Sequence, residues 1–405
     1  MIDDVTTSAN DNSPLFEPLR LPCGVMLKNR IIKSAMSDSL GDGCGLPTRE
    51  QMRLYARWAE GGLAAAIIGE VQGNGHFAEK PGNLVLSMDQ DPAPFKALAE
   101  AGAAEGALLW LQLGHAGAMA HAPISTPKGP SALDLPGLQC DALSLEEIRA
   151  LPEDFAATAV LARDFGFGGA EIHAAHGFLL SQFLSPLFNK RTDDYGGSLE
   201  NRMRLILETV AAVRQTVGPD FPIAIKINAT DQLEGGFSQE EALQLVTSLE
   251  TTSIDLIDIS GGTYFPGAKS ASDAGGGGPY FLSFAEKAKK LTAKPLMVTG
   301  GFKKRHDAED AIASGKADII GLARALVIEP ELPHKWQADP AFDPPFPRFD
   351  ARPEGGITAW YTMRMTDWAE DQSASGRALP QAVADYEARD QERVKRWKAR
   401  FGGQN

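Results

Sequence analysis

PIAIKIN at residues 222–228 decides the fold together with the three runs that follow it, DLIDIS at 255–260, PLMVTG at 295–300 and ADIIGL at 317–322. Each run is short and almost continuously apolar, as in parallel strands that are buried on both faces. The intervals between the runs are long enough for the helical crossover that parallel strands require. Four runs upstream share this character: RIIKSAM at 30–36, AAAIIG at 64–69, ALLWLQ at 107–112 and GAEIHA at 169–174.

Helix starts fall in the gaps between these runs. A serine or threonine followed three residues later by glutamate or glutamine matches the capping-box pattern. Eight strands alternating with helices predict an α/β fold, a (β/α)8 TIM barrel, rather than an open doubly wound sheet. No G-x-G-x-x-G follows the first strand, so no Rossmann nucleotide site is expected. The helix starts are Thr48 with Gln51, Ser144 with Glu147 and Ser238 with Glu241.

The rest of the chain suggests three parts. Residues 1–13 are polar and predict a disordered leader, and residues 14–335 hold the single barrel. Residues 336–405 are first Pro-rich and then helical, which predicts an extension packed on the barrel or on a neighbouring subunit. The glycine run Gly275–Gly278 fits either an active-site lid or a flexible surface connection.

Composition narrows the class of partner. The net charge of −14 at pH 7 disfavours nucleic acid and anionic membrane surfaces, so we expect a small-molecule substrate and leave a homo-oligomer open. No segment has the apolar length of a membrane span, and three cysteines without C-x-x-C spacing suit a reducing, cytoplasmic setting. His173-x-x-His176 has no third ligand nearby in the sequence, so no metal site is predicted.

The chemistry of a β/α barrel lies at the C-terminal ends of its strands. Polar side chains in or after the first six runs should therefore converge on one rim, although any one of them alone could simply bond loop backbone. Two neighbouring imidazoles there suggest donors that grip an oxygen or another anionic acceptor atom. The rim residues are Ser37, Glu70, Gln112, His115, His173, His176, Lys226, Asn228 and Ser260.

The last two strands carry a separate signal. Thr299-Gly300-Gly301 and Gly321-Leu322-Ala323-Arg324 follow them. The loops after strands 7 and 8 form the recurring phosphate site of this fold, and glycines let backbone N–H groups approach a ligand. Arg324 can add a bidentate contact to the phosphate.

The stretch HAAHGFLLSQFLSPLFNKRTDDYGGSLENR at 173–202 closely resembles the strand-4 signature of the Old Yellow Enzyme family of flavoproteins. The resemblance covers about residues 15–335. It extends to NRIIKSAMS at strand 1, LQLGHAG at strand 3, VTGGF after strand 7 and GLARAL after strand 8. It implies a non-covalent FMN enzyme that passes hydride from NAD(P)H through flavin N5 to a small activated acceptor, namely an α,β-unsaturated carbonyl, a nitro compound or a quinone.

The resemblance also assigns residues to the flavin. It places Ala35, Met36 and Ser37 against the ring, with Ser37 and Gln112 bonding its pyrimidine side. Lys226 stands where the family has a cation near N1, which would ease negative charge on the ring. The residues implied for the phosphate are Gly301, Phe302, Ala323 and Arg324.

On the acceptor side, His173 and His176 would bind the acceptor's carbonyl or nitro oxygen. The family's usual tyrosine proton donor is Phe178 here, and phenylalanine cannot donate a proton. Tyr264, in the loop after strand 6, is a candidate substitute donor, although a lone loop tyrosine more often only packs. Two alternatives stay open: a non-redox lyase or aldolase that uses Lys226 on a phosphorylated substrate, and a non-catalytic flavin-binding protein.

Overall fold

Eight parallel strands close into a barrel in the computed structural model, which describes residues 13–268, 278–349, 353, 355–372 and 376–402. Pairing runs in the order β3, β14, β13, β12, β11, β10, β6, β4, and β3 with β4 completes the ring. The predicted (β/α)8 barrel is therefore confirmed. The barrel strands are β3 (Ile31–Met36), β4 (Ala65–Gln72), β6 (Leu108–Leu113), β10 (Gly169–Ala174), β11 (Ile223–Asn228), β12 (Leu256–Ser260), β13 (Leu296–Thr299) and β14 (Ile319–Leu322).

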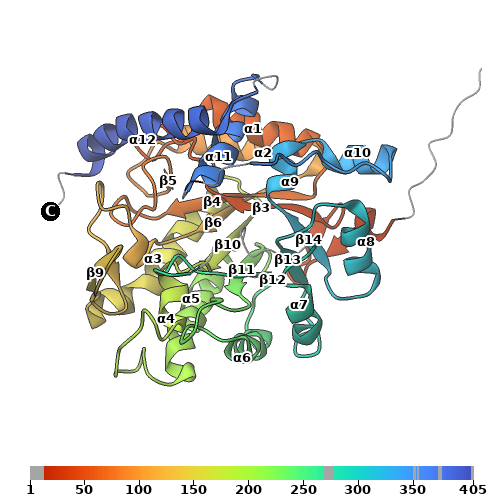
Figure 1. Cartoon of the computed structure of the whole chain (residues 1–405). Helices are drawn as coiled ribbons and strands as arrows, with labels where there is room; N and C mark the ends of the chain where they lie inside the picture. The colour runs from red at the N-terminus through yellow and green to blue at the C-terminus, as the bar shows by residue number, and fades with distance from the viewer. Residues whose placement is uncertain (1–12, 269–277, 350–352, 354, 373–375, 403–405) are drawn as a thin grey trace, which may run out of the picture.

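Helices surround these strands (Figure 1). Ser144 and Ser238 begin their helices with complete capping boxes, as predicted. Thr48 also caps its helix, but the Gln51 side chain donates to Asp38 at 3.0 Å instead of returning to the cap, so that box is incomplete. The helices are α1 (Arg49–Glu60), α2 (Pro92–Gly102), α3 (Leu145–Asp164), α4 (Leu179–Leu184), α5 (Leu199–Val217), α6 (Gln239–Glu250), α7 (Leu282–Ala288), α8 (Arg305–Ala313), α9 (Arg324–Ile328), α10 (Leu332–Ala338), α11 (Gly356–Ala369) and α12 (Leu379–Phe401).

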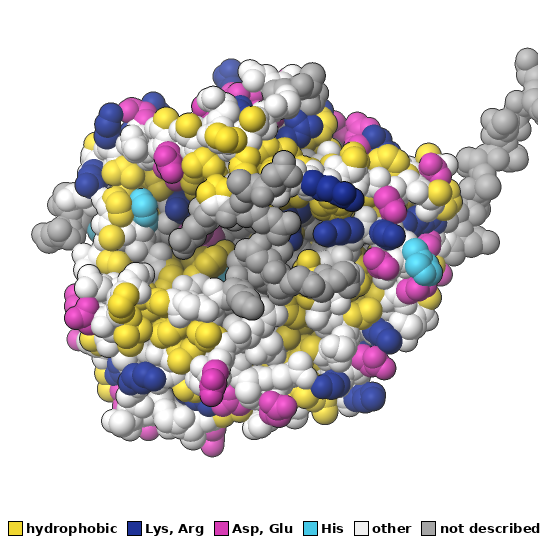
Figure 2. Space-filling model, in the orientation of Figure 1, with side chains coloured by type: hydrophobic (Ala, Val, Ile, Leu, Met, Phe, Trp, Pro, Cys, Tyr) yellow, Lys and Arg dark blue, Asp and Glu magenta, His cyan; other side chains and the backbone are white. Residues whose placement is uncertain are grey.

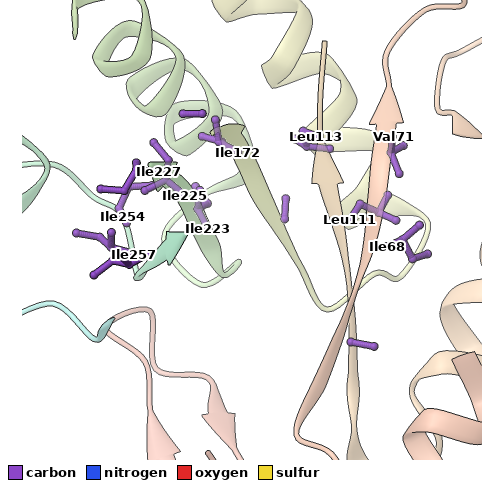
Figure 3. Packing of buried hydrophobic residues seen from close by; sticks show 14 of the residues in the cluster. Ile68, Val71, Leu111, Leu113, Ile172, Ile223, Ile225, Ile227, Ile254 and Ile257 are labelled. Carbon is purple, nitrogen blue, oxygen red and sulfur yellow. The ribbon is translucent and has the colours of Figure 1, made fainter. Parts of the chain in front are cut away.

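Two apolar layers hold the barrel together. The outer layer lies between strands and helices, and Figure 3 shows side chains of β4, β6 and β11 in it, Ile68, Leu111 and Ile225 among them. The inner layer fills the barrel, and on β6, β11 and β12 its residues lie two positions before Gln112, Lys226 and Asp258. Because strand side chains alternate between faces, this spacing directs the site residues inward as well. The inner layer includes Ile32, Ala65, Ile67, Trp110, Ala224, Leu256, Met297 and Ile319.

Short strands complete the ends of the barrel. A hairpin of β1 (Leu19–Arg20) and β2 (Met26–Leu27) brings Leu21 and Leu27 against the inner apolar layer. β5 (Leu84–Val85) pairs with β4, and β7 (Lys128–Gly129), β8 (Leu133–Leu135) and β9 (Leu138–Ala142) form a small sheet before α3.

The C-terminal extension packs on its own barrel. The α12 helix lies against α11 and reaches the loop after β4, where Trp397 Nε1 donates to Gly75 O at 3.0 Å. The helical part of the predicted extension is present. The predicted leader lies outside the described residues except for Ser13, as does the glycine run Gly275–Gly278 except for its last member.

Surface charge is mixed. Acidic and basic side chains are interspersed over the face in Figure 2, with apolar side chains between them. Within the described ranges, no helix has the length and apolar character needed to cross a bilayer, and no group of three metal-ligating side chains is found.

Candidate active site

A charged layer lies directly above the inner apolar layer. Lys226 Nζ bonds the Asp258 carboxylate and lies 3.5 Å from Glu171 Oε1. Gln112 Nε2 donates to the same Glu171 oxygen at 2.7 Å. Burial alone would lower the pKa of Lys226, but the two carboxylates outweigh it and raise that pKa, so the lysine stays charged. The layer fixes Gln112 and Lys226 relative to each other across three strands.

Above this layer lies a cavity of about 310 Å³ at the C-terminal ends of the strands. This is where barrel enzymes bind their ligands. Its wall combines strand ends, the loops after β4, β12 and β13, and one face of α11. The lining residues are Ala35, Met36, Ser37, Glu70, Glu79, Gln112, His173, His176, Phe178, Ser260–Tyr264, Tyr280, Phe281, Thr299, Gly300, Ala323, Arg324, Ile357, Thr358, Tyr361 and Thr362.

The two histidines belong to a chain of four polar groups. Glu70 Oε1 lies 2.5 Å from His173 Nδ1, and His173 Nε2 lies 3.2 Å from His176 Nδ1. His176 Nε2 lies 2.9 Å from the Ser260 hydroxyl. The backbone N–H of His176 donates to Asn228 Oδ1 at 2.9 Å, which fixes the second imidazole. The chain therefore joins β4, β10 and β12 across one wall of the cavity, and Asn228 on β11 anchors it.

Burial controls the charge of this chain. Burial, and then the nearby Lys226 charge, lowers the pKa of His173 to about 3, and burial lowers that of His176 well below its ordinary value. Burial raises the pKa of Glu70 to about 8. At neutral pH both imidazoles are therefore neutral, and each carries one proton that it can donate from one of its two nitrogens.

The opposite wall carries a single arginine. Arg324 begins α9, lines the cavity and packs its guanidinium 5.6 Å from the centre of the Tyr361 ring. Among the described residues it has no carboxylate partner. Gly300 and Gly301 before it have φ of +121° and +86°, a conformation that favours glycine. A guanidinium without a counter-ion in the wall of a cavity can bind an anion.

Aromatic side chains cover the side of the cavity that holds the two histidines. Phe178 lies 4.9 Å from the His173 ring and 5.8 Å from the Tyr264 ring, centre to centre. Tyr264 is 59% exposed, so it stands at the mouth of the cavity rather than deep within it. Its backbone N–H donates to His176 O at 3.3 Å, which holds the loop after β12 beside the histidines.

Most residues predicted from the sequence meet in this cavity. Of the residues assigned to the flavin and the acceptor, three lie outside its lining: Lys226 is in the charged layer below, and Gly301 and Phe302 follow Gly300, which does line it. The rim residue Asn228 also lies outside the lining, where it accepts from the backbone N–H of His176. Among the rim residues, His115 points to a neighbouring cavity and its Nδ1 accepts from Gly117 N.

Sequence reasoning missed several lining residues. Glu79 lies in the loop after β4, half-buried, and makes no hydrogen bond or ion pair within the described part of the chain. Tyr280 precedes α7, and Tyr361 belongs to the extension, which was not expected to reach the site. A loop carboxylate in a cavity leaves no pattern in the sequence, but the aromatic residues of GITAWYTMRM in α11 could have indicated a packed helix face.

Comparison with known proteins places this geometry among flavoenzymes. Residues 14–341 match the family model described as the NADH:flavin oxidoreductase / NADH oxidase family. The chain is 33% identical over 351 residues to the NADH-dependent flavin oxidoreductase iliE of Hypocrea jecorina, covering 78% of this chain and 87% of that protein. It is also 33% identical over 319 residues to an NADH oxidase of Thermoanaerobacter brockii, of which it spans 49%.

Solved structures agree with this result. A 2-naphthoyl-CoA reductase in complex with 2-naphthoyl-CoA superposes with a TM-score of 0.75 at 28% identity, covering 80% of this chain and 52% of that one. Morphinone reductase in complex with tetrahydroNAD gives a TM-score of 0.69 at 26% identity, covering 83% and 93%.

Proposed function

We propose that this chain reduces a small activated acceptor: an α,β-unsaturated carbonyl, a nitro compound or a quinone. The chain belongs to the NADH:flavin oxidoreductase / NADH oxidase family and is an FMN-dependent enzyme with NAD(P)H as its reductant. One observation carries the proposal. Two neutral imidazoles line the cavity with His173 Nε2 3.2 Å from His176 Nδ1, and an acceptor oxygen that took over the Nε2–H groups from their present partners would be held by both rings.

The residues present fit FMN. The Arg324 guanidinium has no carboxylate partner in the described ranges, and it follows β14, which lies opposite β10 in the eight-stranded ring. A guanidinium of this kind can bind a phosphate. Glu171 Oε2 is buried without a hydrogen-bond partner in the same ranges, beside Gln112 and above the inner layer. Arg324 would hold the phosphate with Ala323, Gly301 and Phe302, while Ala35, Met36, Ser37 and Gln112 would line the ring. When bound, FMN would supply the two-electron carrier that takes hydride from NAD(P)H and passes it to the acceptor.

The protein's own residues would orient and polarise the acceptor. Donation from His173 and His176 to an acceptor oxygen draws electron density from the conjugated carbon, which makes that carbon a better hydride acceptor. Phe178 and Tyr264 would exclude water from one face of the bound molecule. Lys226, fixed by Asp258 and Glu171, would place a permanent positive charge below the ring.

Alkene reduction also needs a proton on carbon. Phe178 occupies the position of the family's proton donor and has no acidic hydrogen. We propose Tyr264 as the substitute, because its ring lies 5.8 Å from that of Phe178 at the cavity mouth. Its 59% exposure lets solvent return the proton to it.

The non-redox alternatives find less support. A Schiff-base lysine must lose its proton and face the substrate. Lys226 instead keeps a raised pKa, is 1% exposed and lies outside the cavity lining.

The test begins with the purified protein. We expect a yellow protein whose flavin is identified by mass as FMN and is bleached anaerobically by NADH or NADPH. The bleached protein should be reoxidised by a benzoquinone, by 2-cyclohexenone or by a nitroaromatic compound. Bleaching without reoxidation by any of these would refute the proposed acceptor class, and colourless protein would refute flavin binding.

A further inference from the structure

Glu70 reaches the cavity only because its strand is distorted. On β4, Ile67 packs inside the barrel and Ile68 outside it, so strict alternation would direct Glu70 outward with Ile68. The pairing of β4 with β6 instead shifts register between Ile68 and Val71, and Glu70 has a φ of +56°. A β-bulge re-aims a side chain in this way.

His176 shares this unusual backbone. Its φ is +60°, also in the left-handed region that non-glycine residues rarely adopt. Such conformations are energetically costly and cluster at functional sites. Two members of the four-group chain are thus held in strained conformations, and the result is a continuous path from Glu70 through both imidazoles to Ser260.

We propose that Glu70 is a positioning residue whose proton sets the direction of this hydrogen-bond chain and thereby decides whether the two histidines can donate to an acceptor. The inference rests on the proposed function and identifies a control within its site. With Glu70 protonated, its O–H donates to His173 Nδ1, so both His173 and His176 carry their protons on Nε2. With Glu70 ionised, His173 Nδ1–H donates to Glu70, and both protons lie on Nδ1.

The two arrangements differ by one proton, which leaves for solvent when Glu70 ionises. Each imidazole keeps one proton throughout and only moves it from Nε2 to Nδ1, while the Ser260 hydroxyl changes from acceptor to donor. In the ionised state His173 Nε2 and His176 Nε2 have only lone pairs, and a carbonyl oxygen offers them no hydrogen. In the protonated state the two Nε2–H groups donate to His176 Nδ1 and Ser260 Oγ, and an acceptor oxygen would take them over from these partners. Acceptor binding at this pair therefore requires the protonated state.

The surroundings of Glu70 favour that state. Its carboxyl is 3% exposed, and no cation contacts it in the described part of the chain. Burial raises its pKa to about 8. Groups on every neighbouring element face the chain: Gln72 on the same strand, Glu79 from the loop after β4, His173 on β10, Tyr264 from the loop after β12, and Lys226 below His173.

The test uses a ligand that does not itself titrate. Cyclohexanone carries the acceptor oxygen but no reducible alkene, and its binding to FMN-loaded protein is followed as a shift in flavin absorbance from pH 6 to pH 9.5. In the wild type we expect affinity to be constant below the pKa of Glu70 and to fall about tenfold for each pH unit above it. Glu70→Gln should abolish this dependence, because an amide does not ionise.

Glu79→Gln is the matched control, since it removes a carboxyl from the same cavity but not from the chain. The affinity of this variant for cyclohexanone should still fall about tenfold per pH unit above the pKa of Glu70. A second readout is independent of activity and of flavin: ¹⁵N shifts of the histidines should report a change from Nε2–H to Nδ1–H across the same pH range in the wild type and none in Glu70→Gln.

Two results would overturn the inference: a flat affinity profile in the wild type, or the same profile in Glu70→Gln. A merely structural Glu70 would lower affinity equally at every pH. Protein that lacks FMN or is not bleached by a nicotinamide would instead refute the proposed function, and in that case the ¹⁵N titration still decides whether the chain reverses.

Discussion

The two walls of the cavity differ in how they are built. The Arg324 wall comes from the loops after β13 and β14, with one arginine, two left-handed glycines and no carboxylate in the lining from those loops. The histidine wall joins β4, β10 and β12 and carries two carboxyls, Glu70 and Glu79, with no cation in the described lining. One wall is suited to a fixed anion, and the other to a neutral molecule held by hydrogen bonds.

This difference separates retention of the cofactor from chemistry on the acceptor. A charge-assisted contact to a phosphate contributes affinity whatever reaction follows. Neutral imidazoles contribute orientation and polarisation, which matter most as charge develops on the acceptor. Changes in one wall should therefore leave the function of the other largely intact.

The double substitution His173→Ala/His176→Ala should have the largest effect. Removing one donor of this kind costs about 10²–10³ in rate, so we expect acceptor turnover to fall at least about 10³-fold. The protein should remain yellow, and flavin reduction by NADH or NADPH, measured by stopped-flow, separates the two half-reactions. Phenolic ligands should also lose their charge-transfer band. A variant that binds phenols as tightly as the wild type would remove the histidines from the site.

How much of this wall could be predicted from the sequence differs by residue. His173 and His176 were found because both follow one strand and match a family signature. The contact of Glu70 with His173 spans 103 positions and depends on a bulge. Simple alternation gives the wrong face for Glu70, so its role needed the structure.

Phe178→Tyr should add a proton donor to the histidine wall alone. Positioned general acids contribute about 10²–10⁴ in rate, and we expect alkene reduction to rise toward the lower figure. Quinone reduction needs no proton on carbon and should not rise with it. The measurement is the ratio of 2-cyclohexenone to benzoquinone turnover.

Tyr264→Phe is the companion variant. If it alone abolishes alkene reduction while Phe178→Tyr changes nothing, the proton comes from the loop after β12. Rapid alkene reduction that is insensitive to both substitutions would show that Phe178 does not limit this step.

Arg324→Ala should weaken the other wall. A buried phosphate would lose a charge-assisted contact worth about 1.5–3 kcal/mol, so FMN should dissociate about 10–150-fold more readily. Dialysis followed by flavin fluorescence measures this loss. Saturating FMN should restore acceptor turnover if the walls are separate. Unchanged FMN affinity would show that Arg324 only packs on Tyr361.

This wall was the easier one to predict, because its signal is local. Glycines and Arg324 follow the last two strands directly, and the fold places those loops together. The contribution of α11 could not be predicted, since only tertiary packing brings Tyr361 back over the barrel. Packing also requires glycine at position 321, which the sequence does not reveal: a Cβ there would lie 2.1 Å from Thr299 Oγ1.

Glu79→Gln should have the smallest effect and tests the charge of the histidine wall. Burial, and then the neighbouring Glu70 carboxyl, raises the pKa of Glu79 to about 7, so its negative charge is absent below that pH and present above it.

An acceptor with its own carboxylate should therefore bind more weakly as the pH rises through 7. A repulsion of about 1 kcal/mol corresponds to about fivefold in KM. Between pH 6 and 7.5, Glu79→Gln should remove this rise for the anionic acceptor, whereas a neutral acceptor of the same shape should show almost none in either protein, because Glu70 ionises mainly above that range. Glu387→Gln makes the same charge change at an exposed position on α12, in the neighbouring outer cavity, and should keep the rise. If both variants behave alike, the effect comes from the overall charge of −14 rather than from the histidine wall.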